Sequence, residues 1–153
     1  MDKAFIAEIT GNYLKDSDKY LVEVKLEPGD RIVVEMDGDT PVSIDDCIAL
    51  TRYIESQLNR EVEDYELEVG SAGISQPFKV LRQYRNAVKK EVEMLLKTGK
   101  KYSGILKAAD ENAVVLTIQK RIKPEGAKRK TTVEEELTFA YNEIKYTKYV
   151  IKL

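Results

Sequence analysis

The first hydrophobic pattern along the chain has the period of a helix. Over residues 2–14 the apolar side chains recur at intervals of three to four positions, which is the spacing of a helix with one buried stripe. They are Phe5, Ile6, Ile9 and Tyr13. We therefore expect an amphipathic helix here, with this stripe facing a core.

Two runs rich in Val, Ile and Leu follow, at residues 20–26 and 31–36, and Pro28-Gly29-Asp30 separates them. Turn residues between two such runs predict a pair of antiparallel strands. A second helix is predicted from residue 43 to about residue 59, because Ser43 and Asp46 have the spacing of a capping box. Its apolar positions are Ile44, Cys47, Ile48, Ile54 and Leu58.

A third strand is predicted at residues 65–69, where Tyr65, Leu67 and Val69 alternate with glutamates. The order in the first half is thus helix, strand, strand, helix, strand. Residues 70–77 contain two glycines and a proline and form the candidate linker. An ordinary turn within one domain remains the alternative.

The second half begins with a predicted short helix at residues 78–88, after which the pattern changes to that of strands. Five short apolar runs with turn sequences between them predict a small barrel. The runs are residues 92–96, 102–106, 114–118, 133–139 and 146–151. The predicted class is therefore α+β, with an N-terminal α-β-β-α-β sandwich domain (1–75) and a C-terminal all-β barrel domain (76–153).

The charge along the chain changes sign at the candidate linker. Residues 1–75 hold 7 Lys/Arg and 18 Asp/Glu, whereas residues 76–153 hold 18 Lys/Arg and 9 Asp/Glu, and the net charge of the whole chain is -2. Such asymmetry favours a nucleic-acid-facing half joined to a half that faces something else. The alternative is that the two halves simply attract each other.

The densest positive segment is residues 120–130, with six cations and one anion around a proline and a glycine. Its cations are Lys120, Arg121, Lys123, Lys128, Arg129 and Lys130. Cations that neutralise RNA phosphates release counterions, so binding would weaken as salt rises. A solvated hairpin tip is the alternative.

A second group of cations precedes the barrel strands, and we expect it to add to the same positive field. The group consists of Lys79, Arg82, Arg85, Lys89 and Lys90. Together, the two groups favour RNA or an RNA-bound acidic partner as the ligand.

Groups that catalyse reactions are scarce in this sequence. The chain has no histidine, and its eight glycines form neither a dinucleotide-binding nor a P-loop pattern. Cys47 lies on the apolar stripe of the second helix, where a buried core thiol is expected. Asp37, Asp39, Asp45 and Asp46 lack the calcium-loop spacing and are explained by a turn and a helix start. We expect no catalytic residue, no metal site and no cofactor.

The apolar runs are too short for a membrane span. The longest is the four residues 113–116, against the roughly 20 that cross a bilayer, and residues 1–3 lead into no signal-peptide core. A single cysteine cannot form an internal disulfide, which fits a reducing compartment. These features predict a cytoplasmic protein without a membrane partner.

Several segments resemble the ribosome maturation factor RimP family, and together they cover nearly the whole chain. Residues 65–73, Tyr-Glu-Leu-Glu-Val-Gly-Ser-Ala-Gly, with Pro77-Phe78, are similar to that family's strand end and interdomain signature. Gly70, Ala72 and Gln76 stand where the family usually has Ser, Pro and Arg. The further matches are Asp46-Cys47, Gly99-Lys100-Lys101-Tyr102, Gly104-Ile105-Leu106 and Tyr141-Asn142-Glu143-Ile144-Lys145.

The resemblance implies a non-catalytic factor that binds the free small (30S) ribosomal subunit and promotes its maturation. It implies contacts with the rRNA and with a small-subunit ribosomal protein, made by a monomer. It also implies that the C-terminal barrel is SH3-like or Sm-like, and that this barrel is the half that binds protein. Gly70, Ser71, Gly73 and Pro77 fall in the interdomain signature.

A free-standing Sm-like RNA chaperone is the main alternative, because residues 92–96 and 114–116 resemble the first Sm motif. The Ile-Arg-Gly of the second Sm motif does not occur in this sequence. An acidic N-terminal segment of 75 residues is also not a feature of that family. An enzyme that acts through carboxylates alone is a third possibility, which mutation of Asp37 or Asp39 would test.

Overall fold

The computed structural model describes residues 2–123, 125–126 and 128–151. The chain forms two compact units, Met1–Gly73 (unit 1) and Ile74–Leu153 (unit 2). Each unit has its own sheet and its own hydrophobic core, so the fold is mixed α+β. Over the described residues, no helix has the length and apolar character that a membrane span requires.

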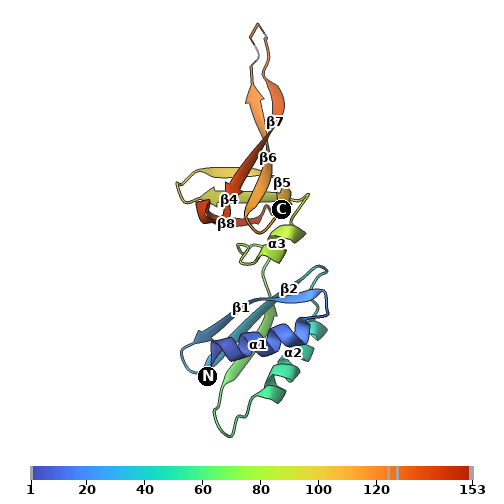
Figure 1. Cartoon of the computed structure of the whole chain (residues 1–153), viewed down its shortest axis with the longest axis vertical. Helices are drawn as coiled ribbons and strands as arrows, with labels where there is room; N and C mark the ends of the chain where they lie inside the picture. The colour runs from blue at the N-terminus through green and yellow to red at the C-terminus, as the bar shows by residue number, and fades with distance from the viewer. Residues whose placement is uncertain (1, 124, 127, 152–153) are drawn as a thin grey trace. The chain divides into compact units, whose positions relative to one another are not determined.

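Unit 1 contains the five elements that the sequence predicts, in the predicted order. They are α1 (Lys3–Leu14), β1 (Lys19–Glu27), β2 (Arg31–Gly38), α2 (Ile44–Gln57) and β3 (Glu66–Ser71). β1 pairs antiparallel with β2, and the turn between them places Gly29 and Asp30 at positive φ. β3 pairs parallel to β2, because α2 carries the chain back along the sheet (Figure 1).

The core of unit 1 joins one face of this sheet to both helices. From β2 the fully buried Ile32, Val34 and Met36 share that face, and Leu50 and Ile54 of α2 pack with them. The predicted stripe on α1 is partly wrong. Its buried residues are Ile6, Ile9, Thr10 and Leu14, whereas Phe5 and Tyr13 are 41% and 43% exposed.

The apolar stripe of α2 also differs from the prediction. Ile44 is 80% exposed and Ile48 is 43% exposed, whereas Leu50 and Ile54 are fully buried. Tyr13 of α1 packs on Tyr53 of α2, with ring centroids 4.6 Å apart, so it serves the contact between the helices. The helix ends at Gln57, because the backbone of Leu58 is extended.

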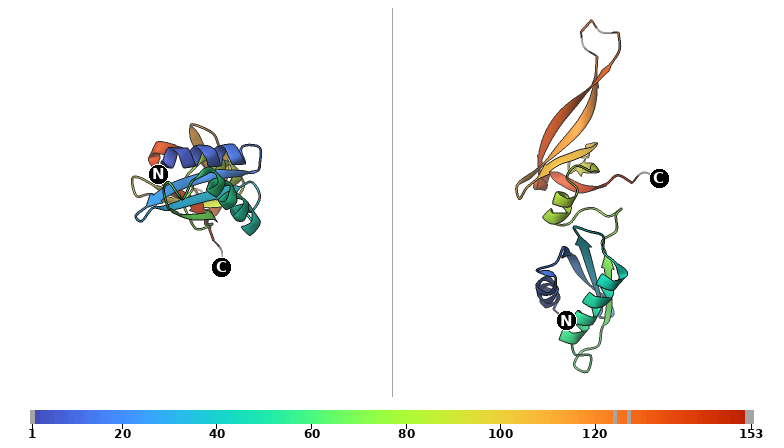
Figure 2. Two further views of the ribbon diagram at one scale, coloured as in Figure 1. Left: turned by 90° about the horizontal axis from the view of Figure 1, so that it is seen from below. Right: turned by 90° about the vertical axis from the view of Figure 1, so that its right-hand side faces the viewer.

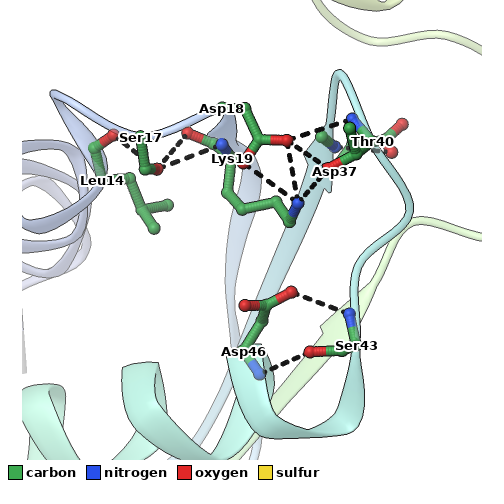
Figure 3. Close-up of polar contacts among 9 residues, drawn as sticks. Leu14, Ser17, Asp18, Lys19, Asp37, Thr40, Ser43 and Asp46 are labelled. Atoms are coloured by element: carbon green, nitrogen blue, oxygen red, sulfur yellow. Dashed lines mark hydrogen bonds and ion pairs between the residues drawn. The ribbon is translucent and has the colours of Figure 1, made fainter.

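The predicted capping box at the start of α2 is confirmed (Figure 3). Ser43 Oγ accepts a hydrogen bond from the Asp46 backbone N–H at 3.0 Å, and Asp46 Oδ2 accepts one from the Ser43 N–H at 2.8 Å. Two N–H groups that lack helical partners are thus satisfied reciprocally.

Unit 2 is a short helix and a five-stranded antiparallel sheet with strand order β7-β6-β5-β4-β8. Its elements are α3 (Leu81–Asn86), β4 (Glu91–Leu96), β5 (Lys101–Ala109), β6 (Ala113–Ile122), β7 (Thr131–Ala140), the 3-10 helix η1 (Tyr141–Glu143) and β8 (Ile144–Tyr149). The five predicted strands are all present (Figure 1). β8 begins earlier than predicted and ends before Ile151.

The helix predicted over residues 78–88 is shorter in the structure. Phe78 precedes it, and its backbone N–H donates to the Thr147 carbonyl of β8 at 2.8 Å. The Phe78 ring packs edge-on against Tyr84 and Tyr149, with centroids 5.1 and 4.9 Å away. Phe78 therefore contributes to the core of unit 2 from the segment before α3.

Close packing between β5 and β6 explains one glycine of unit 2. A Cβ atom at Gly104 would lie 2.3 Å from the Thr117 carbonyl oxygen of β6. That distance is impossible for a side chain without movement of the backbone, so glycine is required where these strands approach.

Candidate nucleic-acid interface

The strands β6 and β7 form a two-stranded ribbon that continues beyond the rest of the sheet. They pair over ten positions, from Ala113 opposite Ala140 to Ile122 opposite Thr131. The neighbouring β5 pairs with β6 only as far as Thr117. Residues 118–122 and 131–135 therefore project from the sheet as a ribbon (Figures 1 and 2).

The end of this ribbon, residues 120–130, carries the cations that the sequence identified, and we call it the ribbon tip. Its six cations are all exposed: Lys120, Arg121, Lys123, Lys128, Arg129 and Lys130. Gly126 has a φ of +78°, a left-handed conformation that suits glycine in a tight turn. Pro124 and Ala127, which belong to the same predicted loop, lie outside the described residues. Among charged groups the tip holds one carboxylate, Glu125, so its potential is strongly positive.

An acidic segment on β7 limits this positive potential to the tip. Glu134, Glu135 and Glu136 lie opposite Gln119, Ile118 and Thr117 on β6. Glu135 Oε2 is 4.0 Å from Lys120 Nζ, and Glu136 forms an ion pair with Lys107 of β5. These glutamates had no predicted role, since their position beside the basic strand depends on the pairing of β6 with β7.

The second group of predicted cations lies elsewhere in unit 2. Lys79 precedes α3, and Arg82 and Arg85 belong to it. The ribbon leaves the sheet on the side away from α3 (Figures 1 and 2). Lys79, Arg82 and Arg85 thus lie apart from the ribbon tip, and their addition to the same positive field stays a prediction.

Arg85 has an acidic neighbour near α3. The pKa of the Asp110 carboxyl is held below its ordinary value mainly by hydrogen bonds from the backbone N–H groups of Asn112 and Ala113, and the charge of Arg85 lowers it further. Arg82 is partly buried, and Arg85 is exposed. Asp110 thus offsets part of the positive charge at this end of unit 2.

The predicted interdomain signature is divided between strand and connecting segment. Gly70 and Ser71 belong to β3, where they pair with Glu35 and Met36, so the linker begins later than predicted. Gly73 is the last residue of unit 1, and Pro77 belongs to unit 2. Nothing lies within 4 Å of a Cβ atom built at Gly70, so a larger residue would fit there.

The candidate chemical groups of unit 1 have structural roles. The thiol of Cys47 is partly buried against the core, and burial raises its pKa, which makes it a poor nucleophile. Asp46 caps α2, and its pKa is lowered by the hydrogen bond from the Ser43 backbone and then by the Ser43 side chain. Within the described ranges, no group of three or more Cys, Asp or Glu side chains is placed to hold a metal ion.

A polar cluster without a signal in the sequence joins the start of β1 to the end of β2 (Figure 3). Lys19 Nζ donates to both carboxylate oxygens of Asp18, at 3.1 and 3.0 Å, and to Thr40 Oγ1 at 2.6 Å. The Thr40 hydroxyl also donates to Asp18, and the pKa of Asp18 is lowered mainly by this bond and then by Lys19. Asp18 therefore links the start of β1 to the segment that follows β2.

Comparison with known proteins gives a consistent result over the whole chain. The model of the RimP N-terminal domain matches residues 11–75. Ribosome maturation factor RimP of Porphyromonas gingivalis strain W83 is 44% identical over 151 residues, which is 99% of each chain. The protein of the same name from Christiangramia forsetii is 33% identical over 130 residues, covering 85% of this chain and 84% of the relative.

Proposed function

The chain belongs to the RimP family, and from this premise we propose that it is a ribosome maturation factor that binds the free small (30S) ribosomal subunit and promotes its assembly without catalysing a reaction. Its relatives over nearly the full chain are named ribosome maturation factors. The partner surfaces in this proposal are the rRNA and a small-subunit ribosomal protein.

The ribbon tip is the observation that carries the proposal. Six exposed cations lie at the end of a two-stranded projection, where phosphates can reach them from several sides. Backbone phosphate contacts provide most of the affinity of such a surface and depend little on base sequence. The glutamates of β7 discourage RNA from lying along the ribbon, which favours contact through the tip.

The cations near α3 provide a second, smaller contact in this proposal. At the end of unit 2 opposite the ribbon tip lie Lys79, Arg82 and Arg85. A different segment of the RNA would therefore contact these three cations. We assign no RNA contact to the signature residues: Gly70 and Ser71 end β3, and Gly73 and Pro77 lie in the segment that follows it.

We further propose that the two units act as two domains, 1–75 and 76–153, the second being an SH3-like or Sm-like barrel. Five antiparallel strands and the 3-10 helix η1 before the last strand support this reading. The protein would act as a monomer in the cytoplasm.

Co-sedimentation with purified small subunits in a sucrose gradient tests the proposal. The full chain should migrate with the subunit at low salt and dissociate steeply as salt rises. The variant Lys128→Gln/Arg129→Gln/Lys130→Gln should reduce the slope of log K against log salt by about 0.7–0.9 for each phosphate that it no longer neutralises.

A matched control removes the same number of positive charges from unit 1. Lys3, Lys15 and Arg52 are exposed there, and the variant Lys3→Gln/Lys15→Gln/Arg52→Gln should leave the slope unchanged. An equal slope in wild type and in the ribbon-tip variant would remove the tip from the interface. Failure of the wild type to associate with small subunits in dilute buffer would overturn the proposed function itself.

A further inference from the structure

Tyr146 lies on the outer face of the unit 2 sheet, on the edge strand β8. The next residue, Thr147, is fully buried and pairs with Met94 in the core. Successive side chains of a strand point to opposite faces, so Tyr146, which lies opposite Leu95, points away from the core. Its side chain is partly exposed, and no other strand in the described part of the chain lies beyond β8 in the sheet.

Two lysines lie close to the Tyr146 side chain. Lys148 Nζ lies 5.1 Å from the ring centroid, within the range of a cation–π interaction. Lys101 of β5 also lies opposite Leu95, and Tyr146 adds to the rise in the pKa of this lysine that Glu93 mainly causes. The ring is thus a partly exposed group with cations beside it.

A single carboxylate fixes both lysines in turn. Glu93 Oε1 lies 2.7 Å from Lys101 Nζ, and Glu93 Oε2 lies 3.7 Å from Lys148 Nζ. Two cations against one anion leave the group positive.

An aromatic ring framed by cations has the composition of a platform on which bases of single-stranded nucleic acid stack. Any base offers a π-face to such a ring, and the lysines attract the adjoining phosphates. A base inside a duplex is already stacked on its neighbours, so the ring selects unpaired bases. This chemistry differs from that of the ribbon tip, where the contacts are with phosphates alone.

We propose that Tyr146, Lys101 and Lys148 form a further RNA contact that stacks an unpaired base. The inference rests on the proposed function, because it deepens the RNA contact of unit 2. It adds a preference that phosphate contacts cannot give: the segment bound at β8 is single-stranded, as in a loop, a bulge or an unfolded strand.

The absence of tryptophan from the chain allows a direct test. The full-length variant Tyr146→Trp carries one tryptophan at the proposed platform, and a stacked base should quench its emission. The probe is an oligouridylate of about 12 nucleotides, within the length bound by single-strand sites. Tyr13→Trp, at a position that is 43% exposed in unit 1, is the matched control.

We expect oligouridylate to quench the emission of Tyr146→Trp in a saturable way and to leave the emission of Tyr13→Trp unchanged. A duplex of the same length should quench Tyr146→Trp only a little. Fluorescence anisotropy with labelled oligouridylate should show binding about fivefold or more weaker for Tyr146→Leu, whereas Tyr146→Phe should keep most of the affinity. Circular dichroism checks that each variant is folded.

Where wild type binds oligouridylate, two results would overturn the inference. One is oligouridylate binding that leaves the tryptophan at 146 unquenched, or that quenches both tryptophans equally. The other is equal affinity of Tyr146→Leu and wild type. If wild type ignores oligouridylate but still co-sediments with small subunits, the stacking site is excluded and the proposed function stands. If it does not co-sediment, the proposed function fails.

Discussion

The hydroxyl of Tyr84 donates a 2.9 Å hydrogen bond to Oγ1 of Thr147, and both side chains are buried. Tyr84 belongs to α3 and Thr147 to β8, so the bond joins the helix at the start of unit 2 to the last strand of its sheet. Away from water, each hydroxyl depends on the other for this bond.

The first prediction concerns the contribution of this hydrogen bond to the free energy of unfolding. Tyr84→Phe leaves the Thr147 hydroxyl without this partner and should lower the free energy of unfolding by about 1–2 kcal/mol. The double variant Tyr84→Phe/Thr147→Val removes both polar groups and should recover part of that stability. Urea unfolding of the two single variants and the double variant measures the coupling. Strictly additive effects would show that the hydroxyls do not interact.

The second prediction is a decrease of stability at alkaline pH that depends on Tyr84. Burial raises the pKa of its hydroxyl, and the bond to Thr147 offsets only part of this effect. In the unfolded chain a tyrosine ionises near about pH 10, whereas folded Tyr84 stays protonated to higher pH. Its contribution is therefore fully present below about pH 10 and is lost as the pH rises through the folded pKa.

Unfolding free energies of wild type and Tyr84→Phe between about pH 8 and 11 check this sign. Wild type should lose more stability than Tyr84→Phe above about pH 10, because the variant has no proton to lose at this position. Parallel curves would contradict the prediction.

The third prediction compares two glycines in strands. Gly104→Ala should destabilise unit 2 by about 1–3 kcal/mol, because the added methyl group would meet the Thr117 carbonyl at 2.3 Å. Gly70→Ala is the control, since its Cβ would meet nothing within 4 Å and β3 tolerates it. The midpoint of chemical unfolding should therefore fall clearly for Gly104→Ala and stay close to that of wild type for Gly70→Ala.

The fourth prediction concerns the acidic segment behind the ribbon tip. Glu135→Gln releases Lys120 from its 4.0 Å ion pair and should steepen the salt dependence of RNA binding by up to about 0.7–0.9 in log–log slope. Glu134→Gln removes the same charge opposite Gln119 and should have a smaller effect. Filter binding at several salt concentrations measures both. Equal slopes for the two variants would mean that only net charge matters.

Much of the fold could be predicted because its signals are local. The turn at Pro28-Gly29-Asp30, the capping box of Ser43 and Asp46, and the alternation at residues 65–69 all depend on residues close in sequence. The predicted helix at residues 78–88 was too long, since the place of Phe78 is decided by Thr147 and by the rings of Tyr84 and Tyr149, far along the chain.

The candidate interface was predictable in composition and not in arrangement. The run of cations at residues 120–130 is visible in the sequence, and the structure places it at the end of a projecting ribbon. The Lys101, Lys148 and Glu93 group around Tyr146 gave no sequence signal, because its members come from three strands that are adjacent only in the sheet.

By itself, the sequence determined the order of helices and strands, the change of charge between the halves and the resemblance to the RimP family. Periodicity, turn chemistry and charge are properties of neighbouring residues, and they survive without knowledge of the fold. Only the tertiary structure decided that β3 runs parallel to β2 and that β6 extends beyond its pairing with β5. It also decided that the cations of α3 lie apart from the ribbon tip. These features depend on the pairing of distant segments, and many pairings are compatible with the same local pattern.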